Sequence, residues 1–151
     1  MNKLLIRPLA EADLNSWVAL ECAVFAEPWS ETQLAGWLNR ERTLALGVFA
    51  PESRQLQGFA LYSYILDEAE LLQIAVAFEA RGLGLASGLM RQAGEQLKSL
   101  GVGRILLEVR DSNLAARNCY RTYGFSEEGV RKGYYKGEQG REDAVLMSLS
   151  L

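Results

Sequence analysis

One β-α-β unit near the middle of the chain restricts the possible folds more than any other feature. An apolar run, LLQIAV (71–76), leads into a turn with two glycines, ARGLGLA (80–86), and then into a helix-like run that ends near residue 99. A second apolar run, GRILLEVR (103–110), follows. No repeated half accompanies this unit, so we do not expect a doubly wound parallel fold.

Hairpin-like strands and further helices surround that unit. Ser30 followed by Gln33 is a capping-box pattern, which predicts a helix that begins near Glu31. Gly101 and Gly124 suit the ends of two other helices. The predicted strands are 4–9, 43–50, 57–66, 70–76, 103–110, 125–135 and 141–150, and the predicted helices are 11–25, 31–41, 84–99 and 111–124. The order is therefore β-α-α-β-β-β-α-β-α-β-β, with a tight turn DEA (67–69) before the fourth strand. It predicts an α/β chain with a mixed sheet and helices on both faces.

The sequence contains no histidine, which excludes several catalytic classes at once. Ser-His-Asp hydrolysis, Cys-His nucleophiles, HExxH metalloproteases and histidine-rich metal sites all require that residue. The two cysteines, Cys22 and Cys119, are too few for a zinc site, so we expect no metal. A catalytic base must be a carboxylate, a lysine with a perturbed pKa, a tyrosine, or water held by one of these.

Length and charge narrow the range of partners. The 151 residues suit one domain that spans 1–151. The net charge of -3 argues against non-specific nucleic-acid binding, and it is compatible with a small molecule or a basic polypeptide. No apolar run approaches the roughly 20 residues of a membrane span, and charges come too early for a signal peptide. We therefore expect a cytoplasmic protein with no membrane partner.

The glycine turn fits neither of the two common nucleotide-binding motifs. Ser87 stands where a dinucleotide fingerprint needs its third glycine, and the chain has no G-x-x-x-x-G-K-S/T run. A strand that passes through small residues into a helix N-terminus favours a phosphate or pyrophosphate. A flexible loop whose glycines only relieve crowding is an equally good interpretation of the turn alone.

In its context the turn resembles motif A of the GNAT family of N-acetyltransferases, Q/R-x-x-G-x-G/A. Arg81, Gly84 and Ala86 match its fixed positions, whereas Phe78 stands where the family often has proline. The resemblance implies a mixed, mostly antiparallel sheet, with acetyl-CoA as cosubstrate. It also implies that the turn holds the pyrophosphate and that the preceding strand pairs with the pantetheine. The coenzyme-binding residues that it implies are Ile74, Ala75, Val76, Arg81, Gly82, Leu83, Gly84, Leu85, Ala86 and Ser87.

A second segment, LEVRDSNLAARNCYRTYGF (107–125), is similar to the RimI-type N-terminal acetyltransferases within that family. Those enzymes acetylate the N-terminal alanine of small-subunit ribosomal protein S-eighteen. The resemblance therefore implies a basic N-terminal peptide of a ribosomal protein as acceptor. It implies Glu108 as general base, Tyr120 as general acid and Asn113 as a further coenzyme contact.

Each of these residues also has a purely structural interpretation. A carboxylate in an apolar strand is costly unless it faces a cleft or a partner, so Glu108 could instead lie on a solvated face beside Arg104 or Arg110. Tyr120 could be a packing tyrosine, and Asn113 could cap its helix. Cys119 suggests an acetyl-cysteine route, but nothing visible lowers its pKa, so we expect direct attack in a ternary complex.

The acceptor site is less constrained by the sequence. Trp29 with Pro28, and Tyr134 with Tyr135, could form its walls or could simply pack. Five acidic residues could attract a basic peptide or form a solvated face: Asp67, Glu68, Glu70, Glu142 and Asp143. Two other functions are compatible with the coenzyme motif, a transferase for a small amine or lysine side chain and a non-catalytic acyl-CoA-binding module. Whether the segment 136–140 becomes ordered on binding is not predicted.

Overall fold

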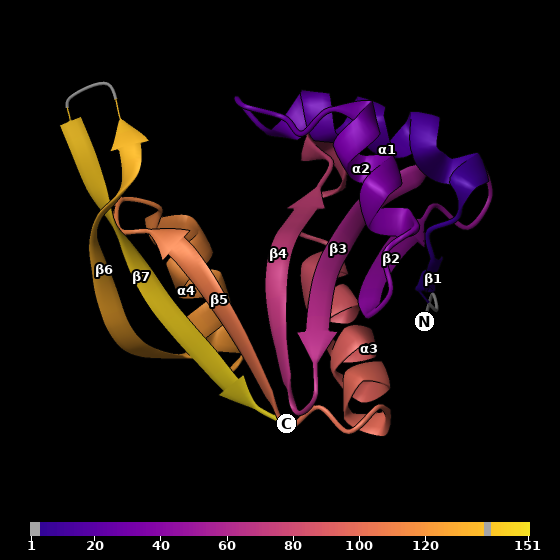
Figure 1. Ribbon diagram of the computed structural model, residues 1–151. Helices are drawn as coiled ribbons and strands as arrows, with labels where there is room; N and C mark the ends of the chain where they lie inside the picture. Colours follow the sequence, from indigo (N-terminus) through magenta and orange to yellow (C-terminus); the bar gives the residue numbers. More distant parts are fainter. Residues whose placement is uncertain (1–3, 138–139) are drawn as a thin grey trace.

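The computed structural model describes residues 4–137 and 140–151, and its main elements follow the predicted order (Figure 1). Its strands are β1 (Leu5–Pro8), β2 (Thr43–Phe49), β3 (Leu56–Ile65), β4 (Glu68–Val76), β5 (Arg104–Arg110), β6 (Ser126–Gly137) and β7 (Gly140–Ser150). Its helices are α1 (Leu14–Val24), α2 (Glu31–Leu38), α3 (Leu85–Ser99) and α4 (Leu114–Tyr123), with short 3-10 helices η1 (Glu11–Asp13) and η2 (Phe78–Ala80). Residues 138 and 139, within the segment 136–140, lie outside the described residues.

The described strands form one mixed sheet in the order β1-β2-β3-β4-β5-β7-β6. Every neighbouring pair is antiparallel except β4 and β5, which are parallel, as a β-α-β unit requires. The mixed, mostly antiparallel sheet is therefore confirmed. The predicted turn DEA was partly wrong, because the β3–β4 hairpin turns at Leu66 and Asp67, and Glu68 and Ala69 already belong to β4.

Helices cover both faces of the sheet, as predicted (Figure 1). We call the face that α1 and α2 cover the front and the face that α3 and α4 cover the back. On the front, Trp17 of α1 is fully buried and packs edge-on against Phe59 of β3. The capping box at α2 is confirmed, because Ser30 Oγ accepts from Gln33 N and Gln33 Oε1 accepts from Ser30 N. Among the described residues, no helix has the length and apolar character needed to cross a membrane.

β5 lies inside the sheet, yet only one of its faces is fully buried. Ile105, Leu107 and Val109 are buried on the back, whereas Glu108 and Arg110 are half-buried on the front. The pairing of β4 with β5 covers only Glu68–Glu70 and Arg104–Leu106. Beyond Glu70 the two strands diverge, as Figure 1 shows. The edge of β4 that faces β5 is therefore left without a strand partner in the described part of the chain.

Asp13 caps the 3-10 helix η1 and links it to β1, which provides a test of the fold. Its Oδ2 accepts hydrogen bonds from Ala10 N and Arg7 Nη1, both at 2.8 Å, and Oδ1 accepts from Arg7 Nη2 at 2.9 Å. The hydrogen bonds from Arg7 hold the pKa of Asp13 below its usual value. A lowered pKa means that this stabilisation is present above the unfolded-state value of about 3.9 and is lost as pH falls through the folded-state value.

We therefore expect Asp13→Asn to lower the free energy of unfolding at pH 7 by about 1 kcal/mol, since the Arg7 side chain is partly exposed. Urea unfolding at pH 7 and at pH 3 checks this. The difference between wild type and variant should shrink at pH 3, and Asp67→Asn in the β3–β4 turn is the control. A difference that stays constant with pH would contradict the assignment.

Candidate active site

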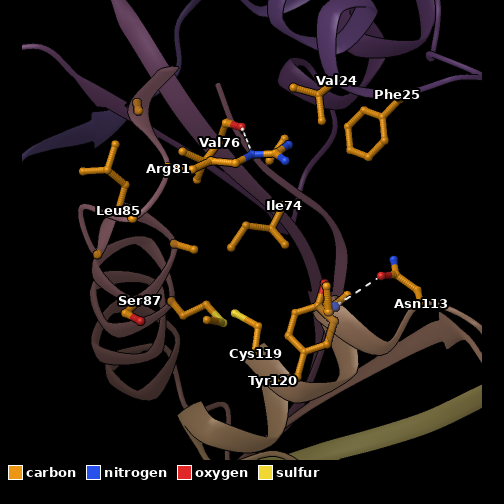
Figure 2. Close-up of a pocket in the computed structure, with 18 residues that line it drawn as sticks. Val24, Phe25, Ile74, Val76, Arg81, Leu85, Ser87, Asn113, Cys119 and Tyr120 are labelled. Atoms are coloured by element: carbon orange, nitrogen blue, oxygen red, sulfur yellow. Dashed lines mark hydrogen bonds between the residues drawn. The ribbon is translucent and has the colours of Figure 1, made fainter. Parts of the chain in front are cut away.

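A cavity of about 550 Å³ opens where β4 and β5 diverge. It is bounded by the end of α1, the edge of β4, the glycine turn with α3, and α4 (Figure 2). Its lining includes every predicted coenzyme residue except Leu83, and it also includes Tyr120: Val24, Phe25, Ile74, Ala75, Val76, Ala80, Arg81, Gly82, Gly84, Leu85, Ala86, Ser87, Met90, Asn113, Ala115, Ala116, Cys119 and Tyr120. Leu83 is not among the lining residues, and its side chain is exposed.

The glycine turn presents backbone amides to the cavity. Gly82 and Gly84 have φ values of 80° and 77°, a left-handed conformation that glycine adopts without strain. The first hydrogen bond of α3 runs from Gly88 N to Gly84 O, so the amides of residues 85–87 have no partner within the helix. Gly84 is the N-cap and offers no side-chain cap. The positive end of the α3 dipole and these free N–H groups favour an anion.

The edge of β4 supplies a second kind of contact. Ile74, Ala75 and Val76 line the cavity and pair with β3 on one side only. A strand edge without a partner can hydrogen-bond an extended ligand through its N–H and C=O groups. An extended amide-containing chain would fit along this edge.

Arg81 lies between the strand and the turn. Its Nε donates to Val76 O at 3.2 Å, and its guanidinium lies 4.0 Å from the centre of the Phe78 ring. Phe78, the residue that departs from the family pattern, is exposed and belongs to η2. The aromatic ring therefore supports the arginine, which Figure 2 shows beside the cavity.

α4 forms the opposite wall of the cavity. Asn113 caps this helix, since its Oδ1 accepts from Ala116 N at 3.2 Å, and the same residue lines the cavity. The phenol of Tyr120 packs edge-on against Phe125, and burial, followed by the nearby Cys119 and Tyr135, raises the pKa of Tyr120 to about 12. Burial also raises the pKa of the Cys119 thiol. At neutral pH both groups are therefore protonated.

Glu108 lies on the front of β5, two residues beyond the last β4–β5 pair. Its side chain is 22% exposed, and Oε1 lies 3.2 Å from Nη2 of Arg131 in β6. Neither predicted alternative partner holds it, because Arg104 pairs with Glu128 and Glu68, and Arg110 pairs with Glu142. Glu108 is thus neither a freely solvated residue nor part of the cavity lining.

Each of the two adjacent tyrosines of β6, Tyr134 and Tyr135, packs against an arginine. The guanidinium of Arg131, which pairs with Glu108, lies 4.7 Å from the Tyr134 ring centre, and that of Arg110 lies 4.4 Å from the Tyr135 ring centre. Burial and then the negative charge of Glu108 raise the pKa of Tyr135. Sequence reasoning missed the role of Arg131, because the contact joins strands 23 residues apart and no local pattern signals it.

The predicted acidic set is divided among different partners. Glu142 accepts from Ser112 N at 2.7 Å, and hydrogen bonds from Ser112 lower its pKa. Asp143 accepts from Gly133 N at 2.9 Å. Glu70 differs, since partial burial and then the charge of Glu108 raise its pKa. The structure therefore places two carboxylates, Glu70 and Glu108, as neighbours on the front of the sheet.

Trp29 lies in the connection between α1 and α2, outside the cavity lining. Its half-buried indole stacks on Trp37 with ring centres 6.1 Å apart. Its role as an acceptor wall, like those of Tyr134 and Tyr135, stays a prediction. The sequence also gave no signal for Val24 and Phe25, which line the cavity from the end of α1.

Comparisons of the sequence and of the structure with known proteins lead to the same family. The Acetyltransferase (GNAT) family matches residues 13–125. A ribosomal protein bS18-alanine N-acetyltransferase from Salmonella typhimurium is 39% identical over 145 residues, 95% of each chain. A protein of the same name from Escherichia coli is 34% identical over 146 residues, 97% of each chain. The crystal structure of the Escherichia coli enzyme superimposes with a TM-score of 0.88 at 35% identity, and covers 98% of this chain and 94% of that one.

Proposed function

Because the chain belongs to the GNAT acetyltransferase family, we propose that it acetylates the N-terminal alanine of a small-subunit ribosomal protein, with acetyl-CoA as the acetyl donor. One observation carries this proposal. A single cavity brings together an unpaired strand edge, a turn of free amides and a half-buried phenol, in a chain similar over nearly its full length to enzymes of that name. The proposal retains the expected cytoplasmic location, because ribosomal proteins are made there.

The cavity residues suit the parts of the donor. Acetyl-CoA supplies an acetyl group as a thioester. The amides of residues 85–87 and the turn at Gly82 and Gly84 would hold its pyrophosphate, and Ile74–Val76 would bind the pantetheine amides. This arrangement directs the thioester toward Tyr120, on the far wall of the same cavity.

Glu108 would accept the proton of the acceptor amine from the front of the sheet. A peptide α-amino group has a pKa of about 7.7–8.0, so it is largely protonated at neutral pH and must lose a proton before it attacks. Glu108 takes that proton, directly or through one water. Glu70 adds a second negative charge beside it, which favours approach of the α-ammonium group. The N–C bond then forms as the C–S bond breaks, and the second proton that the nitrogen loses balances the proton that the departing thiolate takes up.

Tyr120, the predicted general acid, would donate a hydrogen bond to the departing sulfur. A thiol has a pKa of about 8.5, well below the value of about 12 for Tyr120, so the phenol stays protonated and donates a hydrogen bond to sulfur as negative charge develops. We expect Tyr120→Phe to lower kcat by a factor on the order of 10–100, while the Kd for acetyl-CoA stays within about twofold. Steady-state kinetics and calorimetry measure the two quantities. Tyr123→Phe, on the same helix, is the control, and equal losses of kcat in both variants would contradict the role of Tyr120.

The acetyl-cysteine route is not supported. The raised pKa of Cys119 leaves its thiol protonated, and among the described residues no base contacts its sulfur. A thiol without a base is a poor nucleophile at neutral pH. Direct attack within a ternary complex therefore remains the proposed route.

The acceptor is tested with peptides and mass spectrometry. The protein is incubated with acetyl-CoA and a peptide that begins Ala-Arg and contains one internal lysine. Acetylation at the α-amino group is the expected result, and an N-terminally blocked copy of the peptide should stay unmodified. Modification only at lysine would favour a side-chain acetyltransferase. Binding of acetyl-CoA without transfer to any amine would favour a non-catalytic module.

A further inference from the structure

Glu21 is a buried carboxylate to which the proposed reaction gives no role. It lies on α1 with a relative exposure of 0%, and in the described residues no arginine or lysine forms an ion pair with it. A buried carboxylate is costly unless hydrogen bonds compensate for its lost hydration. Its contacts therefore indicate what it does.

Glu21 joins three segments of the chain. Its Oε2 accepts hydrogen bonds from Trp29 N and from Gln73 Nε2, each at 2.9 Å. Its main-chain carbonyl accepts from Phe25 N at 3.0 Å. One residue of α1 thus holds both ends of the segment 25–29 and connects it to β4, 52 residues later in the sequence.

These segments border the site on two sides. Phe25 lines the cavity, and Gln73 directly precedes Ile74 and Ala75, which also line it. The β3–β4 register skips Leu72, the residue before Gln73, so β4 is irregular at this point. The hydrogen bonds of Glu21 therefore fix the α1–α2 connection against the part of β4 where the strand begins to border the cavity.

We propose that Glu21 is a positioning residue of the acceptor site, which holds the segment 25–29, with Trp29 at its end, against β4. The inference rests on the proposed function, because it assumes that the acceptor peptide enters beside this segment. Glu21 does not touch the reacting atoms and acts through Trp29 and Gln73. Loosening this link misplaces the acceptor while it leaves the coenzyme turn and Glu108 unchanged.

Three variants distinguish the loss of the Glu21 hydrogen bonds from a general loss of core stability. Glu21→Met removes both side-chain hydrogen bonds and keeps an unbranched side chain of similar length. Gln73→Met removes only the link to β4, at a half-buried position where substitution is less disruptive. Glu21→Gln keeps an acceptor for Trp29 N and Gln73 Nε2. It also places an amide group where Glu21 Oε1 has no hydrogen-bond partner among the described residues.

We expect Glu21→Met to raise the KM for the Ala-Arg peptide about tenfold and Gln73→Met about threefold, with kcat and the Kd for acetyl-CoA each within about threefold of wild type. Glu21→Gln should keep the KM for the peptide within about twofold of the wild-type value. Hydrogen exchange at the Trp29 amide should be faster in Glu21→Met, because that N–H loses its acceptor. If Glu21→Met does not fold, the other two variants still give the expected order of KM values.

Leu20→Ala is the matched control, since Leu20 is buried on the same helix and lines no part of the cavity. It should lower Tm and leave the peptide KM unchanged. An equal increase of the peptide KM in Leu20→Ala and Glu21→Met would overturn the role of Glu21. An unchanged peptide KM in both Glu21→Met and Gln73→Met would overturn it as well. A wild-type protein that acetylates no peptide α-amino group would instead overturn the proposed function.

Discussion

Glu108→Gln should lower kcat for the Ala-Arg peptide by a factor on the order of 10²–10⁴, with the Kd for acetyl-CoA within about twofold of wild type. The amide keeps the shape of the side chain but cannot accept the proton of the attacking ammonium group. Glu108 lies on the front of β5 and does not line the cavity, so coenzyme binding has no reason to change. Steady-state kinetics with saturating peptide and calorimetry with acetyl-CoA measure the two quantities.

Glu128→Gln is the matched control for this variant. Glu128 also lies on the sheet and pairs with an arginine, Arg104, but it is exposed and remote from the cavity lining. Its replacement should leave kcat within about twofold. At higher pH a growing fraction of the acceptor is already neutral, so the deficit of Glu108→Gln should become smaller as pH rises above about 8. Unchanged turnover in Glu108→Gln would exclude Glu108 as the base and would direct attention to Glu70.

Local sequence patterns predicted the elements of the fold well. The capping box at Ser30 and Gln33 and the glycine at 101 identified helix ends, because caps are chosen by neighbouring residues. The sequence left open whether Glu108 faces a cleft or solvent. β4 diverges from β5 after Glu70, and this leaves Glu108 half-buried on the front. How far two strands stay paired depends on the tertiary structure, and the hydrophobicity of one strand does not encode it.

The candidate site likewise has one part that local sequence patterns predicted and one part that they did not. Residues of the turn are adjacent in sequence, so the pattern around Arg81 and Gly84 located the cavity lining. Arg131 beside Glu108, and Glu21 beside Gln73, are pairs joined across 23 and 52 residues of sequence. Such pairs follow from the strand order and the helix placement, which a motif does not contain. The prediction for Glu142 and Asp143 lacked this information, since each of them is held by a neighbour within the protein.

Gly84→Val should weaken acetyl-CoA binding by a factor on the order of 100, about 2.7 kcal/mol. Two effects add at this position. Gly84 has a φ of 77°, which a β-branched residue adopts only with strain, so the turn shifts toward another conformation. Gly84 also lines the cavity, and a Cβ there meets no atom within 4 Å, so the added side chain is expected to occupy space beside the turn that the coenzyme needs.

Gly101→Val separates these two effects. Gly101 has a φ of 93° and equally open surroundings, but it follows the other end of α3 and does not line the cavity. It should therefore cost a similar amount of stability, measured as Tm, and leave the Kd for acetyl-CoA within about twofold. Equal weakening of binding in the two variants would mean that α3 as a whole, and not its N-terminal turn, determines affinity. Weakening in Gly84→Val alone would identify the turn as the place where the coenzyme's negative charge is held, because only there do strain and occupied space coincide with free amides.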